Sequence, residues 1–151
     1  MISKTCGYAL RGVVFLALDK NKKKKIGIND IAKELEIPQH FLGKIMQELV
    51  RKGIINSTKG PNGGFFVNNH TVLRPLKDII EAIDGLGIFK KCFLGREECN
   101  AANPCPLHDE FDNCRNLIFK TFEELKILDL VLKIENGEGF LSKYNRFYHF
   151  Y

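Results

Sequence analysis

The fold is decided by residues 29–67, which read NDIAKELEIPQHFLGKIMQELVRKGIINSTKGPNGGFFV. At the start of this stretch, Asn29 or Asp30 can cap a short helix that runs to Leu35. Pro38 cannot continue that helix, because it lacks a backbone N–H, but it suits the first position of a new one. Two short helices joined by such a tight turn predict a helix-turn-helix.

The second helix and the hairpin after it complete the pattern. We expect this helix over residues 39–52, with Gly53 as its C-terminal cap. Residues 54–57 and 65–67 then predict two strands, joined by the turn-rich residues 58–64. The sequence therefore predicts a mainly α fold with a small β-hairpin wing, which is a winged helix-turn-helix. The apolar positions that recur along the second helix are Phe41, Leu42, Ile45, Met46, Leu49 and Val50.

Outward from this stretch, the chain divides into four segments. Residues 1–74 form the winged helix-turn-helix domain and begin with a helix over Ile2–Leu18, whose apolar side chains lie nearly all round it. Residues 75–105 hold a short helix and a long cysteine-rich loop, a length that usually signals function or disorder. Residues 106–135 read as a long helix, and residues 136–151 form an aromatic C-terminal tail.

The long helix carries a narrow apolar seam. From about Pro106 to Lys133 the apolar residues recur three or four positions apart. A helix of about 27 residues spans roughly 40 Å, which is long for so small a protein. A helix of this kind usually needs a partner. Cys114 lies on the seam and Cys6 in the first helix, so we expect both to be packing residues. The seam consists of Leu107, Phe111, Cys114, Ile118, Phe122, Leu125, Leu128 and Leu132.

Charge is unevenly divided between the two halves of the chain. Residues 1–74 carry 13 lysines and arginines against five acidic residues, whereas residues 75–151 carry ten against 13. A basic half joined to a mildly acidic one suggests that only the first half meets a polyanion such as double-stranded DNA.

Composition and motifs disfavour several other classes of protein. No apolar run reaches the roughly 18 residues that span a bilayer, and the first residues lack a signal-peptide pattern. We therefore expect a cytoplasmic protein with no membrane partner. The sequence also lacks a Gly-rich phosphate loop, paired catalytic carboxylates and a nucleophile motif, so an enzyme is disfavoured.

DNA contacts are expected at three places. The N-terminal part of a recognition helix faces base edges in the major groove, which selects Gln39, His40 and Lys44. Lys59, at the tip of the wing, suits the electronegative minor groove. The further expected phosphate contacts are Ser57, Thr58 and Asn62 on the wing and Ser3, Lys4 and Thr5 at the start of the first helix.

Four of the five cysteines cluster in the second half of the chain, and three of them lie in the long loop. The spacing is Cys92-x6-Cys99-x5-Cys105-x2-His108. In a reducing compartment, clustered thiols bind metal or do redox work more often than they form disulfides. Iron and zinc both accept thiolate and imidazole ligands, although the close cysteine pairs of a zinc ribbon are absent.

The wing and the loop together carry a family resemblance. The motif Ser57-x-Lys59-Gly60-Pro61-x-Gly63-Gly64-Phe65 resembles the wing signature of the regulator family that contains IscR and NsrR, and the resemblance extends to about residue 133. It implies a homodimer built through the long helix over residues 106–135, which binds a palindromic or semi-palindromic operator. It also implies an iron–sulfur cluster on Cys92, Cys99 and Cys105. His108 resembles the fourth ligand of the IscR branch, which favours [2Fe-2S] over [4Fe-4S].

These features predict a transcriptional regulator that senses iron–sulfur status, redox state or nitric oxide. Changes at the cluster would reorder the loop between the DNA-binding domain and the dimerisation helix, giving two states that differ in DNA affinity. Two alternatives stay open. One is a zinc-stabilised winged-helix regulator without a sensing role, and the other is a protein-interaction module that controls a partner enzyme.

Overall fold

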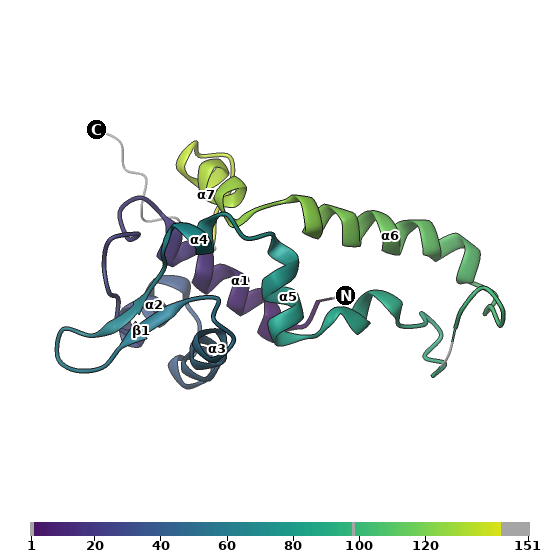
Figure 1. The fold of residues 1–151 in the computed structure, drawn as a ribbon, viewed down its shortest axis with the longest axis horizontal. Coiled ribbons are helices and arrows are strands. Elements are labelled where there is room, and N and C mark those ends of the chain that lie inside the picture. Colours follow the sequence, from purple (N-terminus) through teal and green to yellow (C-terminus); the bar gives the residue numbers. More distant parts are fainter. Residues whose placement is uncertain (1, 98, 143–151) are drawn as a thin grey trace.

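The computed structural model describes residues 2–97 and 99–142 of the 151-residue chain. It is mainly helical with one antiparallel hairpin, which confirms the predicted fold class. Figure 1 shows a head at one end and an arm, containing α6, that projects from it. No helix in the described part is long and apolar enough to cross a membrane. The elements are α1 (Lys4–Ala17), α2 (Ile28–Leu35), α3 (Gln39–Arg51), β1 (Asn56–Thr58), β2 (Gly64–Phe66), α4 (Asn69–Val72), α5 (Leu76–Ile83), the 3-10 helix η1 (Leu86–Lys90), α6 (His108–Glu124) and α7 (Ile127–Glu135).

Helix α1 forms the centre of the head. It packs against α3, α5 and α7, and its apolar residues enter the main core from several sides, as their all-round distribution predicts. A Cβ at Gly12 would lie 2.8 Å from Met46 Sδ, so the missing side chain lets α1 and α3 approach closely.

The helix-turn-helix and the wing form at the predicted places, with one difference at the first helix. Helix α2 begins after Gly27, so Asn29 and Asp30 lie in its first turn and neither of them caps it. The hairpin pairs Ser57 with Phe65, and Ile26 adds a backbone bridge on the other side of Phe65. The wing is therefore attached to the segment that leads into α2.

The prediction of one long helix is wrong, because this segment forms two helices, α6 and α7 (Figure 1). Leu125 is extended, and its carbonyl accepts a hydrogen bond from Leu76 N at 2.8 Å. Ile127 N donates to the Arg74 carbonyl at 3.0 Å, so residues around the break pair with the segment before α5. Asp129 then accepts from Lys126 N and starts α7. Backbone pairing with the head replaces the helical hydrogen bonds at this point.

The break also changes which residues face inward. In α7, Ile127, Val131 and Ile134 are buried in the head core, whereas Leu132 of the predicted seam is 49% exposed. In α6, Cys114 is exposed, so the expectation that it packs in the core is wrong. Cys6 is fully buried, as expected.

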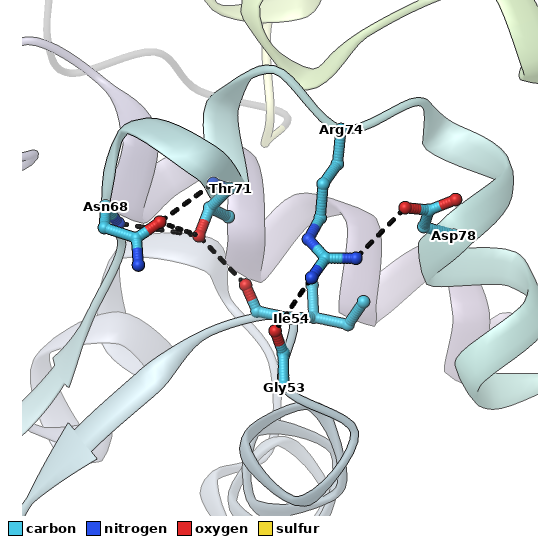
Figure 2. A network of polar contacts seen from close by, with 6 residues as sticks. All are labelled: Gly53, Ile54, Asn68, Thr71, Arg74 and Asp78. Carbon is cyan, nitrogen blue, oxygen red and sulfur yellow. Dashed lines mark hydrogen bonds and ion pairs between the residues drawn. The ribbon is translucent and has the colours of Figure 1, made fainter.

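A polar network fixes the segment that follows the wing (Figure 2). Asn68 caps the short helix α4, which the sequence reasoning did not anticipate, and Thr71 Oγ1 donates to the Ile54 carbonyl at 2.9 Å. Arg74 donates to the Gly53 carbonyl at 3.2 Å and pairs with Asp78 at 3.1 Å. The end of the recognition helix is thereby tied to the start of α5, which leads to the arm.

A second, smaller apolar cluster joins the head to the arm. Its buried members are Cys6 of α1, Ile80 of α5 and Phe89 of η1. Phe119 and Phe122 of α6 pack on Phe89, with ring centroids 5.3 and 6.0 Å away. The aromatic tail predicted for residues 136–151 lies largely outside the described residues.

Candidate DNA-binding surface and metal centre

The outer face of α3 is an open surface of polar side chains. Gln39, His40 and Lys44, which are predicted to contact base edges, are exposed there. They line a shallow depression together with Gln47 and Arg51, which the sequence reasoning missed. His40, Lys44 and Gln47 follow one another at intervals of four and three residues, which places them on one face of the helix. The same spacing could have identified Gln47 and Arg51 from the sequence. This surface can meet base edges and phosphates.

The wing presents its predicted residues to solvent. Ser57 and Thr58 are exposed on β1, and Lys59 and Asn62 are exposed at the tip. Close backbone contact shapes the hairpin, because a Cβ at Gly63 would lie 2.2 Å from the Thr58 carbonyl oxygen. The tip can therefore be narrow enough to enter a groove.

The three predicted contact residues at the start of α1 differ in their surroundings. Lys4 and Thr5 are exposed. Ser3 accepts from Cys6 N and so caps α1, while its hydroxyl and its N–H donate to the Asp84 carboxylate at 2.5 and 2.7 Å. Ser3 therefore links the start of α1 to the end of α5.

The structure brings three of the predicted metal ligands together. The sulfur atoms of Cys92, Cys99 and Cys105 all lie within 4.8 Å of one another. His108, which is buried, adjoins this group, with its Nδ1 3.3 Å from Cys99 Sγ. Cys114 contacts the Glu110 carbonyl instead and lies apart from the cluster.

Local hydrogen bonds hold the cysteine loop in this arrangement. Gly95 N donates to the Cys92 carbonyl at 3.0 Å, and Gly95 has φ +74°, a conformation that favours glycine. His108 N donates to the Cys105 carbonyl at 2.9 Å, which fixes Cys105 at the start of α6. Arg115, a buried residue that the sequence reasoning missed, reaches from α6 to the Lys91 carbonyl at 3.4 Å.

The two cysteines at the ends of the motif differ in acidity. Desolvation opposes ionisation of Cys92, but backbone N–H groups of Arg96 and Leu94 and the neighbouring thiols outweigh it and lower the pKa of Cys92 to about 7. Desolvation is the main reason that the pKa of Cys105 is raised. Cys92 therefore ionises more readily than Cys105, and the thiolate is the form of cysteine that can bind a metal.

Comparison with known proteins finds relatives that match most of this chain. It is 34% identical over 133 residues to a helix-turn-helix-type transcriptional regulator of Aquifex aeolicus, covering 87% of this chain and 91% of the relative. It is 27% identical over 142 residues to the regulator NsrR of Oceanobacillus iheyensis, covering 93% and 94%. The solved structure of CymR, the global cysteine regulator of Bacillus subtilis, shares the fold with a TM-score of 0.70 at 20% identity, covering 87% of this chain and 96% of CymR.

The family assignment rests on a match over most of the chain. The model of the Rrf2 family, described as iron-dependent transcriptional regulators, matches residues 2–133. This range includes the helix-turn-helix, the wing, the cysteine loop, α6 and all but the last two residues of α7. The chain therefore belongs to the Rrf2 family and is a transcriptional regulator rather than an enzyme.

Proposed function

We propose that the protein is a cytoplasmic, homodimeric DNA-binding regulator whose affinity for its operator is controlled by an iron–sulfur cluster. The proposed ligands are Cys92, Cys99, Cys105 and His108. The observation that carries this proposal is the group of three sulfur atoms within 4.8 Å of one another. The family description as iron-dependent supports it.

The residues present fit such a cluster. Three thiols and one imidazole are a donor set that iron–sulfur clusters use, and the histidine favours [2Fe-2S] over [4Fe-4S]. When bound, the cluster would supply a redox-sensitive and removable cross-link between the loop and α6. Arg115 and the Gly95 turn hold the loop for this purpose.

The same donor set favours zinc as the second candidate. Zinc commonly takes three cysteines and one histidine at structural sites. In that case the centre would hold the loop in one state, and the regulator would have no sensing role. The two candidates differ in metal, colour and redox behaviour.

The cluster would act on DNA binding through contacts that the head and the loop share. Phe89, three residues before Cys92, packs in the same cluster as Cys6 of α1. Asp84, at the end of α5, holds the start of α1 through Ser3. A loop that reorders would therefore disturb α1, which packs on the recognition helix.

Dimerisation is proposed through α6. This helix packs against α5 and η1, whereas its Leu117 side chain is 66% exposed. A second copy would cover this surface and place two heads on a symmetric operator, since HTH dimers read two half-sites.

The identity of the metal centre is tested by purification under anaerobic conditions. We expect a coloured protein with stoichiometric iron and sulfide, visible absorption bands and no stoichiometric zinc. Cys99→Ser should abolish the bands, His108→Ala should shift them, and the matched control Cys114→Ser should leave them unchanged. A colourless protein with one zinc per chain would refute the cluster.

DNA binding is tested with genomic fragments in gel shifts. We expect Lys59→Glu to abolish the shift, because it places a negative charge at the wing tip, whereas Lys33→Glu on α2, which is not among the named contacts, should have a small effect. The logarithm of the affinity should fall linearly with the logarithm of salt concentration. A flat dependence, or no shift by the wild type, would favour the protein-interaction module.

A further inference from the structure

Phe41 occupies an unexpected position on the recognition helix. Its spacing with Leu42 and Ile45 suggests an apolar face, and both of these residues are buried. Phe41 itself is 55% exposed in the first turn of α3. It lies between Leu42, which enters the core, and His40, whose ring centroid is 4.2 Å from that of Phe41.

The exposed ring borders a groove between the starts of α1 and α3. This groove has a volume of about 360 Å³. Tyr8, Pro38 and Ile45 form its apolar walls together with Phe41. Lys4 and Lys44 line the same groove, so two cations accompany the apolar surface.

The chemistry of this groove selects its occupant. Single exposed apolar residues are common on protein surfaces, but this one lies on a recognition helix beside two lysines. The lysines complement phosphate groups. In the major groove the C5-methyl group of thymine is the apolar group that base edges present, and phenylalanine is among the residues that contact it.

We propose that Phe41 is a specificity-determining residue that recognises the methyl group of a thymine in each half-site, while Lys4 and Lys44 contact the adjacent phosphates. This inference rests on the proposed DNA-binding function and adds a preference for one base. It assigns part of the sequence readout to an apolar contact beside the polar contacts expected from Gln39 and His40.

The test removes the methyl group from the DNA. The probe is the duplex that the purified protein itself enriches from a random-sequence library, with each thymine replaced in turn by deoxyuridine. We expect one symmetric pair of replacements to weaken wild-type binding by about fourfold per methyl group, the effect of one buried methyl group. Phe41→Ala should bind the thymine duplex and the deoxyuridine duplex equally.

Two further variants keep the test decisive. Phe41→Gln retains the length of the side chain but should also lose the response to deoxyuridine. Leu73→Ala truncates a residue directly after α4 that is 54% exposed, and it should retain the full response. Wild-type binding that ignores every replacement, or a response that persists in Phe41→Ala, would overturn the inference while leaving DNA binding intact. A wild type that enriches no sequence would overturn the proposed function as well.

Discussion

The link between Ser3 and Asp84 provides a quantitative test of how the two parts of the molecule are joined. The Asp84 carboxylate accepts two hydrogen bonds from Ser3, at 2.5 and 2.7 Å, and lies at the N-terminus of α1. We predict that Asp84→Asn lowers the free energy of unfolding by about 1–2 kcal/mol. Hydrogen bonds to a charged group contribute about 1.5–3 kcal/mol, but this pair is exposed and asparagine keeps one accepting oxygen, so about 0.7–1 kcal/mol of this contribution is lost. The favourable charge at a helix N-terminus adds about 0.3–1 kcal/mol.

Thermal unfolding followed by circular dichroism measures this effect in the metal-free protein. For a chain of this size, 1 kcal/mol corresponds to about 2–4 °C in Tm, so a loss of about 1–2 kcal/mol should lower Tm by about 2–8 °C. Asp30→Asn is the matched control, because Asp30 also lies in the first turn of a helix. If Asp84→Asn lowers Tm no more than Asp30→Asn, the hydrogen bonds to Ser3 do not stabilise the junction.

Three other predictions address the core, the helix break and the dimer. Burial, and secondarily the charge of Asp84, raises the pKa of Cys6 from 9.0 to about 12. The folded state therefore holds the thiol proton that the unfolded state loses, so stability is complete below pH 9 and is lost as pH rises towards 12. Relative to Cys6→Ala, the wild type should lose about 2 kcal/mol of unfolding free energy between pH 8 and 10.5, measured by urea denaturation; equal losses would refute the shift. Ile127→Ala should cost about 2–4 kcal/mol in the same assay because Ile127 is fully buried, whereas Leu132→Ala should cost under about 1 kcal/mol; equal costs would favour the unbroken seam. Leu117→Glu should convert the dimer into a monomer in analytical ultracentrifugation, while Leu73→Glu should not; a dimer that survives Leu117→Glu would place the interface elsewhere.

The head could be predicted well from the sequence because its signals are local. Pro38 and the glycines of the wing mark turns that physical chemistry restricts to few conformations, and the apolar residues of α1 indicate a buried helix on all sides. The cysteine spacing also predicted which sulfur atoms lie together, since Cys92, Cys99 and Cys105 belong to one loop.

The sequence predictions are wrong where long-range contacts determine the local structure. The period of the seam continues through Leu125, but pairing of the backbone with Arg74 and Leu76 breaks the helix there. A sequence pattern does not record such a partner, although Asp129, three residues after Lys126, could have indicated a new helix start. Phe41 follows the period of its helix yet lies outside the core, because the starts of α1 and α3 leave a groove there.

The proposed function requires that the metal centre controls DNA binding. The most direct measurement compares the Kd of the anaerobically purified protein for its selected duplex with that of the same protein after the iron is removed by a chelator. We predict a change of at least about tenfold, or 1.4 kcal/mol, in the wild type and in Cys114→Ser, and none in Cys99→Ser. Equal Kd values for the two forms of the wild type would contradict this prediction.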